Sequence, residues 1–485
     1  MRWLALMLAV VLVPWSSPAF AAGALTVDGR FFRDATGGTV ILRGTDVGAN
    51  SKVPPFKAID PLTQLDPLPT WGMNVIRLLF TWEAYEAVKG TYDDSGYLAY
   101  YKSVVEAAGQ RGLYVVVDFH QDAFSRYSLQ GCGEGFPEWA LPPSVTPATP
   151  DNGPDCVDWG QNQLGDADIN ASWDAFYSDA NGVRTAYLAM ITRVATALAG
   201  ESAVIGYDML NEPLGDEPTQ IGPLYNDAVA AIRTVDPKAI AFVSPNSVTS
   251  AGEATKLLQP TFTNYCYAPH FYDPTVSLLQ SWGGSDESIG FGPMTTTATA
   301  WNVPLFVGEY GSPPSVDEVD GYMGAMATQL NTALASGAQW AYTPGWTPAN
   351  KDDWDDQDYS IVDNTGAMRA NFRPRPFARR IAGTPTMLTV SDEMDAKQNA
   401  MQLAWTNDPA AGATELYVPA AYFGGSVGVD GDGDVKCKLT GDLASCTAKT
   451  AGAKSVRVAA ATKRRCGLTG AEALAFVFLF RRRRR

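Results

Sequence analysis

Two glutamates in the sequence follow directly on short apolar runs. Glu212 lies in the sequence Asn-Glu-Pro, and Glu309 lies in the sequence Gly-Glu-Tyr-Gly. Two carboxyl groups on either side of a sugar, one protonated and one ionised, are what glycoside hydrolysis requires. Either glutamate alone would be interpreted as a surface or ion-paired carboxylate, but the two together indicate a candidate catalytic site.

Further polar and aromatic side chains lie within or directly after other apolar runs. They include both histidines of the chain, although a lone histidine in such a place is as often a hydrogen-bonded core residue. Beside the two glutamates, the set consists of Arg77, His120, Asp122, Asn211, His270, Tyr272 and Trp346. This combination suggests that several apolar runs end at one shared site.

Strands and helices alternate along the segment that carries these residues. The predicted strands are 40–43, 74–80, 114–119, 204–210, 240–244, 265–271, 305–308 and 339–343, and the predicted helices include 97–111, 183–199, 224–235 and 316–336. Alternation of this kind predicts parallel strands with right-handed crossovers, and therefore an α/β fold of the (β/α)8 TIM barrel type over residues 22–384. A doubly wound open sheet is the alternative, but no Gly-x-Gly-x-x-Gly turn follows the first strand.

The barrel explains where the candidate residues fall. Functional side chains of such barrels lie at the C-terminal ends of the strands. Glu212 ends the fourth predicted strand and Glu309 the seventh. These two strands face each other across a ring of eight, so the two carboxyl groups are expected to converge over the barrel mouth.

The pattern changes after Pro385, where short alternating runs are separated by Gly, Asp and Pro turns. These runs, at 387–390, 401–405, 414–418, 426–429 and 455–459, predict a small antiparallel β-sandwich over residues 385–462. The stretch 430–434 imitates the start of a calcium loop, but Val435 and Gly441 occupy the positions of the required glycine and glutamate. We therefore predict a turn there, and no metal or cofactor elsewhere.

Both ends of the chain resemble targeting segments. Residues 1–21 have the basic start, short apolar stretch and small-residue cleavage pattern of a secretory signal peptide. Residues 463–485 combine Cys466, an apolar stretch and a run of arginines, as in sorting or anchor tails of bacterial surface proteins. We therefore expect a secreted protein, or one tethered to the bacterial cell surface through this tail. A first core helix and a buried last helix are the alternatives.

The cysteines fit an exported chain, in which disulfides are stable. Cys132 and Cys156 lie in one long segment, 124–182, which we interpret as a substrate-covering insertion pinned by their disulfide. Cys437 and Cys446 are close in sequence in a predicted hairpin and form the second expected pair. Cys266 lies in an apolar run and is expected to be a buried free thiol.

Composition and charge exclude several classes of protein. A hydrophobic fraction of 46% with 11% aromatic residues indicates a well-filled globular core rather than a disordered or fibrous chain. The formal net charge of −16 repels phosphate backbones, so nucleic acid is not an expected partner. The acidic stretch 352–356 is predicted to be a solvated rim beside the cleft.

The motifs resemble those of glycoside hydrolase family 5, a retaining (β/α)8 family, and within it the endoglycoceramidases. The resemblance covers about residues 24 to 460. It rests on the motifs around Glu212 and Glu309 and on the segments 50–56, 118–122, 207–213 and 373–385. It implies hydrolysis of the β-glucosidic bond between an oligosaccharide and the ceramide of a glycosphingolipid, by a monomer in transient contact with a membrane surface.

The resemblance also implies a role for each residue. Glu212 would be the general acid/base and Glu309 the nucleophile. Arg77 would orient Glu309 and keep it ionised, Tyr272 would hydrogen-bond Glu309, and His270 would support Glu212. Asn211 would bind the 2-hydroxyl of the reacting sugar. The sugar subsite nearest the scissile bond would be lined by Lys52, His120, Asp122 and Trp346, with Trp346 as a stacking floor.

Two other functions stay open at this point. A family 5 endo-β-glycanase acting on glucan or mannan would share the fold and the two glutamates. A carbohydrate- or lipid-binding surface protein without activity is the third hypothesis, but such a protein has no need for both glutamates.

Overall fold

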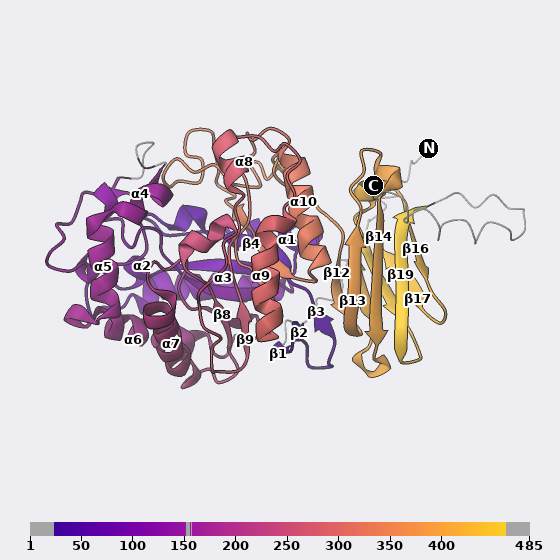
Figure 1. Ribbon diagram of the computed structural model, residues 1–485, viewed down its shortest axis with the longest axis horizontal. Coiled ribbons are helices and arrows are strands. Elements are labelled where there is room, and N and C mark those ends of the chain that lie inside the picture. Colours follow the sequence, from indigo (N-terminus) through magenta and orange to yellow (C-terminus); the bar gives the residue numbers. More distant parts are fainter. Residues whose placement is uncertain (1–23, 152–155, 157, 462–485) are drawn as a thin grey trace, which may run out of the picture.

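The computed structural model describes residues 24–151, 156 and 158–461, which form two units side by side (Figure 1). A barrel with its helices occupies the N-terminal part, and a β-rich unit follows it. The predicted signal peptide and the predicted tail, including Cys466, lie outside the described residues. Within the part that is described, no helix is long and apolar enough to cross a bilayer.

The first unit is built on eight parallel strands. In chain order they are β4 (Arg43–Val47), β5 (Val75–Thr81), β6 (Tyr114–His120), β7 (Val204–Asp208), β8 (Ile240–Val243), β9 (Tyr265–Tyr267), β10 (Phe306–Val307) and β11 (Ser336–Tyr342). They pair in the order β10-β11-β4-β5-β6-β7-β8-β9, and parallel bridges from Tyr267 to Leu305 and from Phe271 to Tyr310 join β9 to β10. The ring is therefore closed, and the predicted (β/α)8 barrel is confirmed.

Helices connect these strands on the outside of the barrel (Figure 1). They are α1 (Pro67–Thr70), α2 (Trp82–Tyr85), α3 (Ala99–Gln110), α4 (Trp159–Gly165), α5 (Ala167–Tyr177), α6 (Val183–Leu198), α7 (Gly222–Arg233), α8 (Pro274–Leu279), α9 (Ser288–Trp301) and α10 (Val319–Thr332). The four predicted helices correspond to α3, α6, α7 and α10. The sequence analysis missed α9, because Gly290, Gly292 and Pro293 interrupt its helical pattern.

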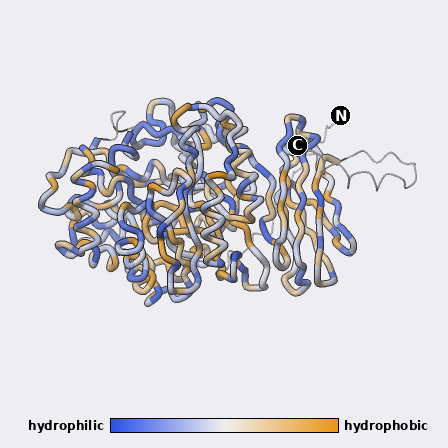
Figure 2. The backbone as a smooth tube through the Cα atoms, viewed as in Figure 1, coloured by the Kyte–Doolittle hydropathy of each residue, from blue (hydrophilic) through white to orange (hydrophobic). Residues whose placement is uncertain are grey.

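The second unit consists of two antiparallel sheets, as expected for a β-sandwich. One sheet has the order β13 (Gly383–Val390), β14 (Ala400–Asn407), β19 (Gly452–Ala460) and β16 (Val427–Gly431). The other has the order β1 (Thr26–Asp28), β2 (Phe31–Arg33), β3 (Thr39–Val40), β12 (Phe377–Ile381), β15 (Thr414–Tyr417), β18 (Leu443–Thr447) and β17 (Lys436–Thr440). More and less buried residues alternate along β14, and Figure 2 shows hydrophobic and hydrophilic residues intermixed along the second unit. Such a pattern is typical of sheets with one buried face.

The N-terminal strands correct the sequence analysis in one respect. The predicted first barrel strand, 40–43, is wrong, because β3 ends at Val40 and pairs with β12, while the barrel strand β4 starts at Arg43. The apolar run between them divides at this point: Ile41 packs in the core of the second unit, and Leu42 packs in the barrel core. Strands β1 to β3 and β12 thus lie in the range assigned to the barrel but belong to the sheets of the second unit.

The structure confirms the predicted pairing of the cysteines that it describes. Disulfides join Cys132 to Cys156 and Cys437 to Cys446, and Cys266 is a buried free thiol. The first disulfide closes the segment 124–182, which leaves the barrel after β6 and returns at α6. The second disulfide links β17 to β18 across their hairpin.

Candidate active site

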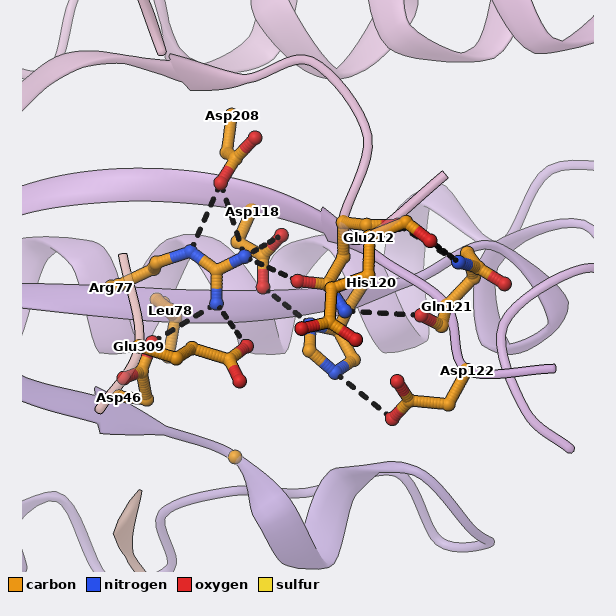
Figure 3. Close-up of polar contacts among 12 residues, drawn as sticks. Asp46, Arg77, Leu78, Asp118, His120, Gln121, Asp122, Asp208, Glu212 and Glu309 are labelled. Carbon is orange, nitrogen blue, oxygen red and sulfur yellow. Dashed lines mark hydrogen bonds and ion pairs between the residues drawn. The ribbon is translucent and has the colours of Figure 1, made fainter. Parts of the chain in front are cut away.

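A buried arginine organises the C-terminal end of the barrel (Figure 3). Arg77 projects inward from β5 and is fully buried. Its guanidinium lies 3.0 Å from carboxylate oxygens of Asp46, Asp118 and Asp208, and 2.8 Å from Oε1 of Glu309. These acids come from β4, β6, β7 and the end of β10, so one cation links four strands. A buried charge is stable only when it is paired in this way.

Burial changes the protonation of the acids around Arg77. Burial raises the pKa of Asp46 to about 8, although the positive charge of Arg77 opposes that rise. Burial also raises the pKa of Asp208. At neutral pH the cluster therefore carries less negative charge than its number of carboxyl groups suggests. This limits the repulsion around the one guanidinium.

Both oxygens of Glu309 are held by hydrogen bonds. Arg77 donates to Oε1, and the hydroxyl of Tyr272 donates to Oε2 at 2.8 Å. Tyr272 reaches Glu309 because the segments after β9 and β10 run side by side, with the amide of Phe271 donating to the carbonyl of Glu309 at 2.9 Å. Only 7% of the Glu309 side chain is exposed, so its carboxylate has a fixed position in the cleft.

Glu212 sits in an unusual backbone turn after β7. Its φ angle is 37°, in the left-handed region that non-glycine residues rarely adopt, and such residues concentrate at functional sites. The side-chain amide of Gln121 donates to the carbonyls of Asn211 and Glu212 at 2.8 and 3.0 Å and so holds the turn. Oε1 of Glu212 lies 2.8 Å from Nδ1 of His270, and 15% of the Glu212 side chain is exposed. Burial raises the pKa of Glu212.

The two glutamates and His270 converge as predicted. One carboxylate oxygen of each glutamate and a ring nitrogen of His270 all lie within 4.8 Å of one another. Burial alone would lower the pKa of His270, but the charge of Glu309 and the hydrogen bond with Glu212 raise it. The imidazole therefore lies close to both carboxyl groups, and these groups favour its protonated form.

A second group of side chains lies beyond Asp118. Nδ1 of His120 is 2.6 Å from Asp118, and its Nε2 is 3.4 Å from Asp122. Asp122 in turn forms a buried ion pair with Lys52. Burial alone would lower the pKa of His120, but the charges of Asp118 and Asp122 raise it to about 10. The predicted residues Lys52, His120 and Asp122 are thus brought together and linked to Arg77 through Asp118.

The tryptophan beside this group is not the predicted one. Trp340, in β11, stacks on His120 with 5.5 Å between ring centroids and lies 4.6 Å from the ammonium of Lys52. Trp346 instead donates to Asp358 at 2.8 Å and packs against Arg369, which lies 3.7 Å from its ring. The sequence analysis missed Trp340 because it looked for side chains after the strand, whereas Trp340 lies within β11.

Two further features near Lys52 were also missed. The acidic stretch 352–356 is not a solvated rim, because Trp354 is 1% exposed and Asp352 and Asp355 are fully buried. Trp354 packs on Trp159 of α4 and draws its neighbours inward. Glu134, also fully buried, pairs through its backbone with Asp122. Only its place two residues after Cys132 could have indicated that it is held against the site.

Two groups within the described residues have the spacing of metal ligands. One is His120, Asp122 and Glu134, and the other is Glu212, His270 and Glu309. In the first group Lys52 already pairs with Asp122, and in the second Arg77 already pairs with Glu309. Both therefore contain a cation of the protein itself, and their chemistry is that of acids and bases.

Comparisons with known proteins agree with this geometry. Residues 61–346 match the family model described as Cellulase (glycosyl hydrolase family 5). A glucosylceramidase of Aspergillus fumigatus is 37% identical over 142 residues, which are 24% of this chain and 18% of that protein. Endoglycoceramidase I of Rhodococcus hoagii (strain 103S) is 30% identical over 198 residues, 40% of this chain and 38% of that one. The chain thus matches well under half the length of these curated relatives.

The fold as a whole also has solved counterparts. Endo-glycoceramidase II from a Rhodococcus species, solved as a ganglioside GM3 complex, superposes with a TM-score of 0.71. The match covers 90% of this chain and 100% of that one at 23% sequence identity, so it shows that the fold is shared. Since the family model spans more than half of the chain and includes both segments that carry the paired glutamates, the chain belongs to glycosyl hydrolase family 5.

Proposed function

We propose that the chain is a retaining hydrolase that cleaves the β-glycosidic bond between the sugar and the ceramide of glycosphingolipids. The observation that carries this proposal is the pair Glu212 and Glu309, whose oxygens lie within 4.8 Å of each other. Retaining enzymes place their two carboxyl groups about 5 to 5.5 Å apart, and inverting enzymes about 6.5 to 9.5 Å. The relatives are named glucosylceramidase and endoglycoceramidase, and these names support a glycosylceramide as the substrate.

In the first step Glu309 attacks the anomeric carbon and Glu212 protonates the departing oxygen. Arg77 and Tyr272 hold Glu309 by one oxygen each, which fixes the attacking carboxylate. Because burial raises the pKa of Glu212, that group keeps its proton at a pH where an exposed glutamate has lost it. The C–O bond to ceramide breaks, and a glycosyl ester on Glu309 forms.

In the second step water cleaves the ester. Glu212, now ionised, accepts a proton from the water molecule as its oxygen attacks the anomeric carbon. The carboxylate of Glu309 is released, and two successive inversions restore the β configuration. His270, 2.8 Å from Glu212 and 3.5 Å from Glu309, lies where it can stabilise whichever glutamate is ionised.

The sugar would bind on the side of His120. The amide oxygen of Asn211 accepts from Arg77, and its nitrogen donates once, to the carbonyl of Gln121. An amide nitrogen carries two protons, so one remains for the 2-hydroxyl of the sugar. Lys52, His120 and Asp122 would bind other hydroxyls, and Trp340 would provide the apolar face that the sequence analysis assigned to Trp346.

We further propose that the lipid lies on the opposite side and that this side contacts a membrane. A small pocket beside Glu212 and His270 is lined by residues 244–247, 249 and 250, after β8. Four large apolar side chains are exposed on this segment and on the helices α8 and α9, which follow β9: Val248, Leu278, Leu279 and Ile289, at 44%, 73%, 73% and 78%. Exposed apolar groups clustered around a cleft are typical of lipid or membrane contact.

The double variant Leu278→Asp and Leu279→Asp tests this contact. Rates on glucosylceramide in vesicles should fall, whereas rates on a soluble aryl glucoside should not change. If the double variant and the unaltered protein are equally active on vesicles, a role of this surface in membrane contact is excluded.

We also propose that the protein works as a monomer outside the cytoplasm. Disulfides are stable in oxidising compartments and rare in the cytosol, and the chain forms two of them. Fractionation of the native producer would test the location. Recovery of the protein only from the reducing cytoplasm would contradict it.

A β-glycanase acting on polysaccharide is the second candidate, because the family model that matches is described as Cellulase. One experiment separates the two functions. The purified protein is incubated with detergent-dispersed glucosylceramide and ganglioside and, separately, with soluble β-glucan and mannan, and products are identified by mass spectrometry. Free ceramide that is absent with Glu309→Gln supports the proposal. Shortened glucan or mannan with intact glycolipid overturns it in favour of a glycanase.

A further inference from the structure

Beyond His120, the loop that follows β11 packs on the residues proposed to bind the sugar. The ammonium of Lys52 lies between two indole rings, 4.6 Å from Trp340 and 3.9 Å from Trp354. Lys52 is 1% exposed and its partner Asp122 is 4% exposed. The side chains that could bind a sugar here are therefore covered by Trp354.

Trp354 is packed on its other side as well. Its ring centroid lies 5.1 Å from that of Trp159, in α4. Helix α4 lies in the insertion that the Cys132–Cys156 disulfide closes. The loop after β11 and the insertion after β6 thus meet at the two tryptophans, and together they form a wall beside Lys52.

The loop that carries Trp354 is held by its own contacts. The carboxylate of Asp352 accepts from the amide of Tyr359 at 2.6 Å, and the amide of Asp352 donates to the carbonyl of Gln357 at 3.0 Å. Lys351 forms an ion pair with Asp356 at 2.6 Å. These bonds join both ends of the turn, so Trp354 is part of a closed structure.

The wall contains buried polar atoms that have no hydrogen-bond partner within the described residues. They are both carboxylate oxygens of Glu134, both of Asp355, and Nε1 of Trp354. Oε1 of Glu134 lies 3.7 Å from Nε2 of His120. Polar groups buried in this way are costly unless a ligand satisfies them, and hydroxyl groups both donate to and accept from such atoms.

We propose that this wall limits the sugar to a single hexose, with Trp354 blocking a second sugar and Glu134 and Asp355 binding the terminal hydroxyls of the first. The inference rests on the proposed function, because it takes Glu212 to face the leaving group. The sugar then extends from Glu309 past His120, towards Lys52 and Trp354. A second sugar attached at that end would need the space that the Trp354 indole fills.

Burial around these acids is consistent with a role in binding a neutral sugar. Burial raises the pKa of Glu134 to about 8 and that of Asp355 to about 9, against the opposing charges of His120 and Lys52. Both side chains therefore carry a proton at neutral pH. A protonated carboxyl group offers one donor and one acceptor to a hydroxyl group without placing a further charge beside Asp122.

The test compares one sugar with two sugars on the same aglycone. The purified full chain is assayed with glucosylceramide and lactosylceramide in identical detergent micelles, and with 4-nitrophenyl β-glucoside and 4-nitrophenyl β-cellobioside in solution. Release of the intact glycone is followed by mass spectrometry. We expect kcat/KM for the one-sugar compound of each pair to exceed that for the two-sugar compound by at least about 100-fold.

The two pairs separate this inference from the proposed function. Equal release from both members of a pair overturns the wall, whatever the aglycone. If the nitrophenyl pair shows a one-sugar preference but neither glycosylceramide is cleaved, the result supports the wall and contradicts the proposed lipid substrate. If no compound is cleaved, calorimetry measures the binding of isofagomine and of its cellobiose-like form. The wall predicts that only the one-ring isofagomine binds, and equal binding of both compounds overturns the wall.

Variants then locate the block. Trp354→Ala should raise kcat/KM for the two-sugar compounds at least about 10-fold without raising it for the one-sugar compounds. Asp355→Leu, which removes both the donor and the acceptor of this carboxyl group, should lower kcat/KM for the one-sugar compounds. Trp301→Ala, which removes a partly buried indole of α9 that packs on Tyr265 and Tyr267, controls for loss of packing and should not change the ratio. An unchanged ratio in folded Trp354→Ala overturns the role of Trp354.

Discussion

The substitution Glu212→Gln should separate substrates by their leaving groups. The amide keeps the size of the side chain and a polar contact with His270, but it has no proton to give to the departing oxygen. Ceramide leaves as an alkoxide unless it is protonated, whereas 2,4-dinitrophenolate leaves as a stable anion. The loss should therefore depend on the aglycone and not on the sugar.

The size of the effect follows from the position of Glu212. General acid catalysis by a positioned group contributes about 100- to 10,000-fold, or about 2.7 to 5.4 kcal/mol of transition-state stabilisation. The side chain is only 15% exposed and hydrogen-bonded to His270, so water cannot easily replace it as the acid. We expect a loss in the upper part of this range with glucosylceramide. For the first step with 2,4-dinitrophenyl β-glucoside we expect less than about 10-fold.

The assay measures pre-steady-state release of dinitrophenol and steady-state release of ceramide by the same enzyme preparation. Azide should restore turnover of the dinitrophenyl substrate, because it attacks the glycosyl ester without needing a base. Glu253→Gln, at an exposed glutamate, is the matched control and should behave like the unaltered enzyme. An equal loss with both leaving groups would refute Glu212 as the acid.

Three further predictions address charge, pH and the second unit. Arg77→Met leaves Asp46 and three other acids without their cation and should lower the free energy of unfolding, measured in urea, by at least about 3 kcal/mol. A loss below about 1 kcal/mol, similar to that of the control Arg457→Met at an exposed arginine, would contradict the role of Arg77 in the cluster. Burial raises the pKa of Glu212, and the protonated form is the active acid. The value of kcat/KM should therefore persist at pH values above the ordinary pKa of a glutamate and fall as pH rises through the raised pKa. A fall centred near pH 4.5 would exclude a raised pKa for the catalytic acid. Replacing Cys437 and Cys446 by Ala opens a loop with a sequence separation of 9 and should lower the free energy of unfolding, measured by thermal unfolding, by roughly 2.5 kcal/mol. Activity on a soluble glucoside should stay within about twofold, because the disulfide lies in the second unit. Loss of activity in the folded variant would contradict this independence of the active site from the second unit.

Much of the barrel could be predicted because its strands are buried on both faces. Runs such as 75–80 and 114–119, which are apolar except for Arg77 and Asp118, indicate strands buried on both faces when helices alternate with them. The residues that end these runs were therefore placed on one face of the ring, and Glu212, Glu309, Arg77, His270 and Tyr272 do meet there. Position at a strand end was the signal for these residues except Arg77, which lies inside β5.

Other parts depended on contacts that sequence order does not reveal. Strand β3 pairs with β12, more than 300 residues later in the chain, so no local pattern could separate it from the barrel strand that follows. Asp46, Asp118 and Asp208 lie inside apolar strands, and their role appears only when Arg77 is seen to join them.

The loop of Trp354 shows why charge alone misleads. Its four aspartates suggested a solvated surface, and isolated acidic runs usually are one. Here Trp354 packs between Lys52 and Trp159, which draws Asp352 and Asp355 out of water. The partners are far apart in sequence, so burial of this loop could be found only from the fold.

The most direct test of double displacement is the identity of the residue that becomes covalently attached to the sugar. The enzyme is treated with 2-deoxy-2-fluoro-β-glucosyl fluoride, which forms the glycosyl ester but slows its hydrolysis, and peptides are analysed by mass spectrometry. The proposed mechanism predicts one label per chain, on Glu309, with none formed in Glu309→Gln. A label on another residue, or hydrolysis with inversion and no label, would contradict it.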